Sequence, residues 1–354
     1  MIIGVDAGAI GETDDRLKVG VYRVTLELLK HLSRIDSVNS YRLYSFAPIP
    51  QDTMRQFGPN MMNIPLIPST GYLKLRVPIE LSLHPVDMFL GLSQALPQGV
   101  GKSLGFIYDL GFIHYPKLYG THAKKLEKQT EHVTHRSTHI VTISKATKVD
   151  IIKTYNISPS KITVLYPGIS DIFRKNKEKI HHSIPYFLMV GLLKPGKNIP
   201  LAIRAFALLL TKTKKLYDLV IIGGDTGLDS DIYKTIKESK LENRVHLLGF
   251  VQDREVAKWY KGAKAFLALS SSEGYCLPAA EAIASGCPVI HVKNGALSEI
   301  VGDAGIEVKV NDQERIANAM ISIQKRRFDV SCKKQSSQFQ WTKFAQRVYD
   351  ILDI

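Results

Sequence analysis

The sequence lacks the features that define several classes of protein. Its three cysteines, Cys276, Cys287 and Cys332, form no Cys-x-x-Cys pair, which argues against a disulfide framework and against a zinc site of that kind. No apolar run approaches the roughly 20 residues that cross a bilayer. The first residues, Met-Ile-Ile-Gly-Val-Asp, lack the basic start and the cleavage site of a signal peptide. These absences predict a protein of the cytoplasm.

Signals for metal and nucleic-acid binding are also missing. The 11 histidines show no ligand spacing, and His181 and His182 are adjacent in a predicted linker. The sequence has no helix-turn-helix signal, no zinc finger and no aromatic strand pattern of an RNA-binding sheet. We therefore expect neither a metal site nor a nucleic-acid partner.

Positive charge is present in excess and is unevenly distributed. The net charge is +14, yet residues 1–100 are neutral, whereas residues 101–200 hold 16 basic and 6 acidic residues. The basic residues mark the predicted linker 174–182 and one predicted helix, with Lys124, Lys125, Lys128, His132, His135 and Arg136. A solvated helix face and a polar linker would explain them. Attraction to an anionic membrane surface or to a phosphate-bearing acceptor is the other explanation.

Short apolar runs of strand character alternate with segments of helical periodicity. Strands are expected at 1–6, 41–46, 87–92, 104–108, 139–143, 186–191, 219–222, 244–248, 265–269 and 289–292, and helices at 21–32, 144–155 and 200–210. Residues 56–80 show little periodicity, as a loop or a helix on the acceptor side would. The alternation predicts an α/β protein with parallel sheets, long enough for two domains.

One stretch, Ser271 to Val289, carries two carboxylates at the start of a predicted helix. Pro278 suits the first helical turn, and Gly286 followed by Cys-Pro ends the helix. Glu273 then lies before the helix and Glu281 one turn into it. The helix N-terminus suits a phosphate, and the carboxylates suit hydroxyl groups, so together they fit a sugar nucleotide. An ordinary loop carboxylate and a helix-dipole partner would give the same two residues.

The stretch resembles the Glu-x7-Glu signature of glycosyltransferase family 4, the glycosyl transferases group 1. It departs from the usual Glu-Gly-Phe-Gly-Leu-Pro form in Tyr275 and Cys276, and the Cβ of Cys276 disfavours a positive φ. The resemblance implies that Glu273 contacts the transferred sugar and Glu281 the ribose. It also assigns the donor site to Gly274, Tyr275, Cys276, Leu277, Gly20 and Val251.

Further motifs resemble the same family. Tyr108 and Asp109 occupy the place of a His-Asp pair near the sugar, and Asp109 is the nearest candidate for a direct chemical role, although a loop Asp after a strand is also a common structural cap. Lys197 matches a lysine that faces the diphosphate, and Leu192 stands where an arginine is frequent. The resemblance therefore implies Glu273, Asp109 and Lys197 as catalytic residues.

The resemblance implies the GT-B fold, two Rossmann-like domains with parallel sheets facing across a cleft. The expected parts are an acceptor-side domain (1–173), a nucleotide-sugar domain (174–337) and a C-terminal helix on the first domain (338–354). The implied reaction is retaining transfer of a hexose from a nucleoside diphosphate sugar to a hydroxyl of a glycan or lipid-linked acceptor, in cell-surface polysaccharide or glycolipid synthesis at the inner face of the membrane. The alternatives are a sugar-nucleotide 2-epimerase and a non-catalytic sugar-nucleotide binder. The nucleoside diphosphate sugar is a co-substrate, and no cofactor or metal is expected.

Overall fold

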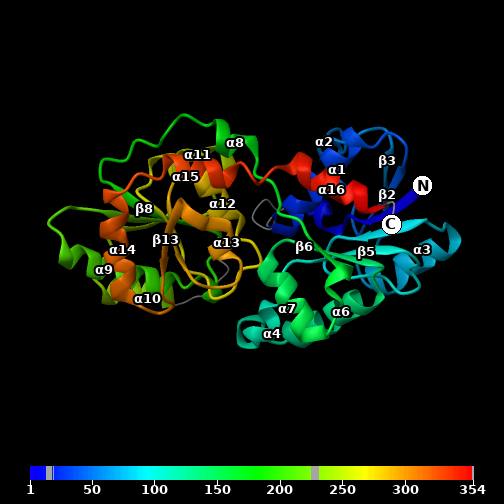
Figure 1. Ribbon diagram of the computed structural model, residues 1–354, viewed down its shortest axis with the longest axis horizontal. Coiled ribbons are helices and arrows are strands. Elements are labelled where there is room, and N and C mark those ends of the chain that lie inside the picture. Colours follow the sequence, from blue (N-terminus) through cyan, green and yellow to red (C-terminus); the bar gives the residue numbers. More distant parts are fainter. Residues whose placement is uncertain (13–17, 19, 225–230, 353–354) are drawn as a thin grey trace. The chain divides into compact units, whose positions relative to one another are not determined.

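The computed structural model describes residues 1–12, 18, 20–224 and 231–352, and the chain divides into two compact units. The first unit contains Met1–Gly168 and Gln340–Ile354, and the second contains Ile169–Phe339. Figure 1 shows that each unit has a sheet covered by helices on both faces. No described helix combines the length and hydropathy that crossing a membrane would require.

The first unit holds a seven-stranded parallel sheet in the order β3-β2-β1-β4-β5-β6-β7. The strands are β1 (Ile2–Asp6), β2 (Ser40–Ser45), β3 (Met61–Pro65), β4 (Met88–Gly91), β5 (Ser103–Ile107), β6 (His139–Thr142) and β7 (Ile162–Val164). Val5 of β1 pairs with Leu43 on one side and Leu90 on the other, and all three are buried. The strand order reverses between β1 and β4, which is where sheets of this kind bind ligands.

Helices cover this sheet in two layers. They are α1 (Gly20–Ile35), α2 (Gln51–Met54), α3 (Val77–Leu83), α4 (Gly111–His114), α5 (Pro116–Tyr119), α6 (His122–Arg136), α7 (Lys145–Tyr155) and the C-terminal α16 (Trp341–Leu352). Helix α16 packs on α1, and the Phe344 ring lies 6.4 Å from that of Phe106 in β5. The C-terminal helix therefore returns to the first unit, as expected.

The second unit holds a six-stranded parallel sheet in the order β10-β9-β8-β11-β12-β13. Its strands are β8 (Tyr186–Val190), β9 (Asp218–Ile222), β10 (Val245–Leu247), β11 (Phe266–Ala268), β12 (Val289–Val292) and β13 (Gly305–Val308). The order reverses between β8 and β11. Two segments that follow these neighbouring strands therefore meet at one point of the carboxyl edge.

Two helical layers also enclose the second sheet. One contains α9 (Ile199–Lys212), α10 (Asp231–Glu238) and α14 (Gln313–Ser322). The other contains α8 (Asp171–Lys175), α11 (Asp253–Gly262), α12 (Leu277–Ala284), α13 (Leu297–Val301) and α15 (Asp329–Ser336). Helix α12 begins and ends near the residues that Pro278 and Gly286 predicted, and Gly286 has a φ of +78°.

The segment 169–175 belongs to the second unit. Phe173 is fully buried, with its ring 6.0 Å from that of Tyr260, and Arg174 donates hydrogen bonds to the carbonyls of Ser336 and Phe339. The units thus divide after residues 168 and 339, whereas the sequence placed the boundaries after 173 and 337.

The segment 56–80 is the part of the first unit where the expectation of a loop or helix was incomplete. It contains the edge strand β3, a short π-helical segment, η3 (Tyr72–Arg76), and the start of α3. The strand was missed because Met-Met-Asn-Ile-Pro has no alternation of buried and exposed side chains; only Met61 is fully buried within it.

Candidate functional site

A pair of opposite charges lies at the carboxyl edge of the second sheet, where the strand order reverses. Lys197 ends the short turn after β8, and Glu273 lies in the loop after β11. The Lys197 Nζ is 2.6 Å from the Glu273 Oε1, and both side chains are largely buried, with 19% and 15% of their surfaces exposed. The sequence predicted both residues for one site, and the structure brings them together.

The mutual attraction of these two groups outweighs their burial. Burial alone would lower the pKa of Lys197 and raise the pKa of Glu273, because each charge loses contact with water. The partner's charge acts the other way, so that the pKa of Lys197 is raised and the pKa of Glu273 is lowered. A hydrogen bond from the Ser270 hydroxyl lowers the pKa of Glu273 further. Both groups are therefore charged at neutral pH.

Hydrogen bonds hold the two loops that carry this pair. Asn198 has a left-handed backbone, with a φ of +54°, and its side-chain amide donates to the Leu269 carbonyl at 2.7 Å. The same amide donates to the Ser271 hydroxyl at 3.1 Å, and the Ser271 amide donates to the Gly196 carbonyl at 2.8 Å. The residue after Lys197 thus fixes the loop of Glu273.

A glycine outside the predicted site also fixes the backbone of Glu273. The Ala296 amide donates to the Glu273 carbonyl at 3.1 Å. Gly295 has a φ of +53°, and a Cβ at this position would lie 2.4 Å from the same carbonyl oxygen. Only glycine fits this approach. Sequence reasoning assigned no role to Gly295.

Cys276 adopts the conformation that its Cβ was expected to disfavour. It precedes α12 with a φ of +73° and a ψ of 72°, and it is 6% exposed. The left-handed region costs a residue with a Cβ about 1–2 kcal/mol, so the surrounding loop must hold it there. Cys276 therefore has the positive φ that its Cβ disfavours, and the buried loop around it must offset the local preference.

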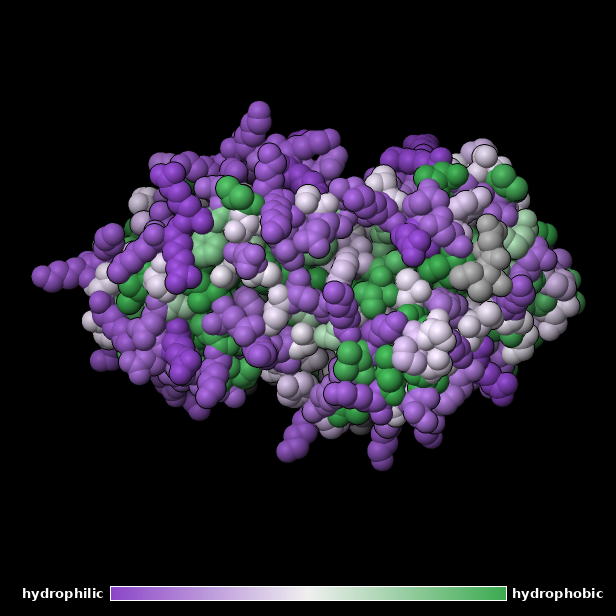
Figure 2. Space-filling model, viewed as in Figure 1, coloured by the Kyte–Doolittle hydropathy of each residue, from purple (hydrophilic) through white to green (hydrophobic). Residues whose placement is uncertain are grey.

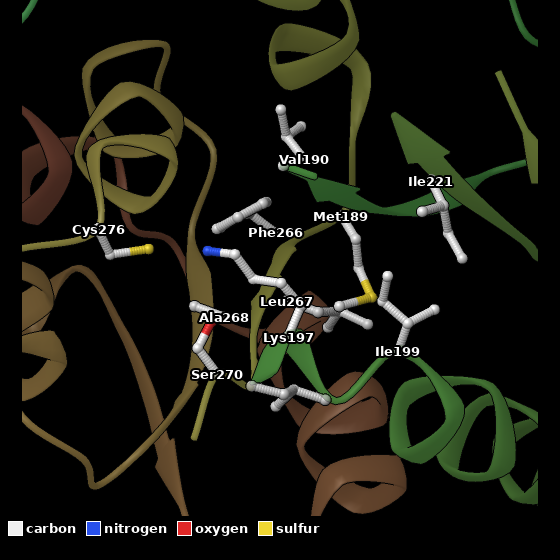
Figure 3. Close-up of a pocket in the computed structure, with 12 residues that line it drawn as sticks. Met189, Val190, Lys197, Ile199, Ile221, Phe266, Leu267, Ala268, Ser270 and Cys276 are labelled. Atoms are coloured by element: carbon white, nitrogen blue, oxygen red, sulfur yellow. The ribbon is translucent and has the colours of Figure 1, made fainter. Parts of the chain in front are cut away.

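The thiol of Cys276 faces the same space as the Lys197 ammonium. Figure 3 shows the two side chains pointing toward each other across a small pocket at the ends of β8 and β11. Burial raises the pKa of the thiol, and the negative charges of Glu273 and Glu281 raise it further, against the opposing effect of Lys197. The thiol is therefore protonated at neutral pH, and both carboxylates act on this one place.

The other residues predicted for the donor site differ in burial and in their distance along the sheet from Lys197 and Glu273. Glu281 is buried within α12, 5% exposed. Gly274 is buried, and the buried Tyr275 ring packs edge-on against Phe339 at 5.6 Å. Leu277, half-buried, begins α12. Val251 follows β10, which is separated from β8 by β9.

The predicted residues of the first unit have local roles in the structure. Asp109 follows β5, and its Oδ1 accepts a hydrogen bond from the Gly111 amide at 2.8 Å, which caps the turn into α4. Tyr108 is buried and its hydroxyl donates to the Leu92 carbonyl at 2.7 Å. Gly20 is exposed at the start of α1, and no heavy atom lies within 4 Å of a Cβ built there. Most of the loop that precedes Gly20 is outside the described residues.

A second polar cluster, which the sequence did not reveal, lies where the order of the first sheet reverses. Asp6 ends β1 and is 2% exposed. It accepts hydrogen bonds from the Ser93 hydroxyl, from the Tyr72 hydroxyl at 3.1 Å and from the Gly8 amide at 3.3 Å. Burial raises the pKa of Asp6 more than these bonds lower it. The sequence offered one signal for this cluster, because Asp6 is a charged residue at the end of an apolar strand.

Comparison with known proteins agrees with this architecture. Residues 170–339 match the family described as "Glycosyl transferases group 1". The O-antigen chain mannosyltransferase B of Escherichia coli is 24% identical over 352 residues, covering 91% of this chain and 92% of that protein. The O-antigen chain mannosyltransferase RfbU of Salmonella typhimurium is 30% identical over 229 residues, covering 62% of this chain and 60% of that protein.

A solved structure extends the likeness to both units. HepE of Anabaena, in complex with UDP-glucose, matches with a TM-score of 0.77 and 16% identity over 99% of each chain. At this identity the match establishes the fold alone. The predicted fold class, two parallel-sheet α/β units of the GT-B kind with a C-terminal helix on the first, is confirmed. Residues 170–339, somewhat under half of the chain, match the glycosyl transferases group 1, and the relatives that this chain resembles are named as mannosyltransferases.

Proposed function

We propose that the protein transfers a hexose from a nucleoside diphosphate sugar to a hydroxyl of a glycan or lipid-linked acceptor, with retention of the anomeric configuration. The observation that carries this proposal is the buried Lys197–Glu273 ion pair beside the N-terminus of α12. A diphosphate suits the ammonium and the helix N-terminus, whereas a sugar hydroxyl suits the carboxylate.

The Lys197 ammonium can serve two ligands. An ammonium has three N–H donors, and the carboxylate of Glu273 accepts from one of them. The others suit the oxygens of the leaving diphosphate, whose negative charge grows as the bond to the sugar breaks. Lys197 would then hold Glu273 ionised before the donor arrives and stabilise the leaving group during the reaction. We propose that this arrangement, with no metal ion, offsets the diphosphate charge.

The two carboxylates divide the donor between them in this proposal. Glu273 binds the hexose, because it lies in the loop beside Lys197. Glu281 binds the ribose hydroxyls from one turn inside α12. The action of both carboxylate charges on the Cys276 thiol supports one continuous site for them. The names of the two mannosyltransferases support a mannosyl donor and a polysaccharide acceptor of the O-antigen kind.

Product analysis tests the reaction class. The protein is incubated with the nucleoside diphosphate sugar that most raises its melting temperature, together with candidate glycan acceptors. Transfer gives free nucleoside diphosphate and a new glycoside. A 2-epimerase would give the C2-epimeric sugar, either still attached to the diphosphate or released with it by water, and no glycoside; a non-catalytic binder would give no product. Either of the last two results would contradict the proposal.

We also propose that the basic side of α6 contacts an anionic membrane, where a lipid-linked acceptor would lie. Lys124, Lys125 and Lys128 are exposed. Exposed hydrophobic residues lie nearby: Tyr115 between α4 and α5, Leu118 in α5 and Val149 in α7. Figure 2 shows green areas among purple ones over the region of α4, α6 and α7. Basic and apolar groups together suit the surface of an anionic bilayer.

Vesicle binding tests this contact. Replacing Lys124, Lys125 and Lys128 with Gln should weaken binding to vesicles that contain anionic lipid, by about 1 kcal/mol per lysine, with a reduced dependence on salt. The control replaces Lys214, Lys215 and Lys237, three exposed lysines of the second unit, and changes the net charge equally. Equal losses in both variants, or no vesicle binding by the parent protein, would contradict the proposed surface.

A further inference from the structure

Two histidines and an aspartate from distant parts of the sequence meet at the amino edge of the second sheet. Asp218 is the first residue of β9, His246 lies within β10, and His182 precedes β8 by four residues. This edge is opposite the carboxyl edge, which carries Lys197 and Glu273. Neither the donor site nor its supporting loops use these three residues.

The three side chains converge on one carboxylate oxygen. The His182 Nε2 is 2.8 Å from the Asp218 Oδ2, and the His246 Nε2 is 3.1 Å from the same oxygen. The three ligand atoms all lie within 4.8 Å of one another. Bonds of about 2.0–2.2 Å in a tetrahedral zinc site place ligand atoms roughly 3.3 Å apart. Small side-chain rotations would therefore suffice to place these atoms around one ion.

The groups around the cluster orient its members. Arg244 lies 3.2 Å from the Asp218 Oδ1, which leaves Oδ2 facing both imidazoles. The His182 ring lies edge-on to Tyr186 and Trp259, with centroids 5.2 Å and 5.8 Å away. Outer groups of this kind fix the orientation of metal ligands. The Asp218 side chain is 4% exposed, and the His246 Nε2 is buried although 36% of its side chain is exposed, so the atoms that would bind an ion are held inside the fold.

We propose that His182, Asp218 and His246 bind a divalent transition metal ion, for which zinc is the best fit. Two imidazoles and one carboxylate are a common zinc ligand set, and water would complete the coordination. Magnesium does not fit, because it prefers oxygen ligands and imidazole supplies nitrogen. The ion would join the segment before β8 to β9 and β10. Its role is to stabilise the second unit, and it takes no part in glycosyl transfer.

Zinc titration of the chelator-treated full-length protein, followed by calorimetry, tests the site. We expect one zinc ion per chain, no comparable binding of magnesium, and a higher melting temperature with zinc. His182→Gln and His246→Gln should each weaken zinc binding by at least about tenfold. His114→Gln is the matched control, because His114 also lies 3.2 Å from a carboxylate, that of Asp150. Among the described residues, this pair belongs to no group of three potential metal ligands. This control should bind zinc like the parent protein.

The alternative is that the three side chains form only a hydrogen-bonded network. In that case the parent protein would bind no stoichiometric zinc, or binding would persist when both histidines are replaced, and either result would overturn the proposal. Cobalt binding by the unaltered protein provides a test that does not depend on the folding of a variant. Intense visible absorption of a tetrahedral cobalt site is expected, and the weak spectrum of the hydrated ion would contradict the site. Glycosyl transfer by His246→Gln should equal that of the parent, which separates this test from that of the proposed function.

Discussion

The carboxyl edges of the two sheets each bury an acidic side chain where the strand order reverses, but the two acids have different partners. Asp6 of the first sheet accepts hydrogen bonds from two hydroxyls and an amide, and burial raises its pKa. Glu273 of the second sheet lies 2.6 Å from the Lys197 ammonium, and its pKa is lowered. Similar topology thus surrounds two carboxyl groups whose pKa values are shifted in opposite directions.

The difference shows what a buried cation does. Neutral donors offset only part of the free energy that a buried carboxylate loses when it leaves water, whereas a cation in contact reverses the balance. The second edge therefore keeps a charged pair, which suits an anionic donor. At the first edge the pKa of Asp6 is raised, so its neutral form is less disfavoured than that of an exposed carboxyl group. This suits hydrogen bonding with the uncharged hydroxyl groups around it.

Removing the cation should have the largest effect. Lys197→Ala should lower kcat/KM about 150-fold, because the charge on the leaving diphosphate is greatest in the transition state. This corresponds to a loss of about 3 kcal/mol of transition-state stabilisation. The binding of the intact donor should change less. Lys194→Ala, an exposed lysine of the same loop, is the control and should change kcat/KM only slightly. Near-normal turnover by Lys197→Ala would mean that the phosphates bind elsewhere.

The next largest effect should distinguish the roles of Glu273 and Glu281. Glu281→Ala should weaken nucleotide binding by roughly 10-fold to 150-fold, since hydrogen bonds to charged groups contribute about 1.5–3 kcal/mol. Glu273→Ala should leave free nucleotide binding nearly intact and remove turnover. Calorimetry with the nucleoside diphosphate, combined with turnover assays, measures both effects. Equal losses of nucleotide binding in the two variants would contradict the division of roles.

Asp6→Asn tests the carboxyl edge of the first sheet through the stability of the protein. Because the folded state raises the pKa of Asp6, its contribution to stability is greatest below the unfolded pKa and is lost as the pH rises through the folded pKa. Removing the charge should therefore increase the free energy of unfolding at pH 7, on the order of 1 kcal/mol, and flatten its dependence on pH. Denaturant unfolding at several pH values measures this. Lower stability of Asp6→Asn at pH 7 would show that the ionised form is favoured.

The smallest expected effect comes from adding a second cation. Leu192 is half-buried in the loop after β8, two residues beyond the end of the strand. Leu192→Arg should tighten nucleoside diphosphate binding by about 1 kcal/mol, roughly fivefold, if the loop approaches the diphosphate. Leu192→Gln controls for the loss of the leucine. Equal affinities in the two variants would place the diphosphate out of reach of this position.

The sequence predicted those parts of the structure whose signals are local. Pro278 and Gly286 marked the limits of α12, and the apolar runs marked most strands, because turn chemistry and periodicity act over a few residues. The positive φ of Cys276 was not predicted, since the constraint on its backbone comes from contacts outside the motif. The resemblance to a family placed Lys197 and Glu273 in one site, but it did not predict their ion pair, which joins residues 76 positions apart.

Other parts of the structure had no sequence signal of their own. Asp6 meets Tyr72 and Ser93 across 66 and 87 positions, and the His182 cluster joins three strands or their flanks. A histidine spacing rule cannot detect such a cluster, since its members are brought together by the order of the strands. The strand β3 was hidden because its edge position removes the alternation that a strand with one buried face shows.

Calorimetric binding of a nucleoside diphosphate to three proteins tests the central claim most directly. The parent protein, Lys197→Ala and Asp6→Asn are each titrated with UDP and with GDP, and the nucleotide that the parent binds more tightly is compared. The free diphosphate carries more charge than the intact donor, so Lys197→Ala should weaken its binding at least about tenfold, whereas Asp6→Asn should stay within about twofold of the parent. Unchanged binding by Lys197→Ala, with a large loss in Asp6→Asn, would contradict the assignment of the donor to the charged edge of the second sheet.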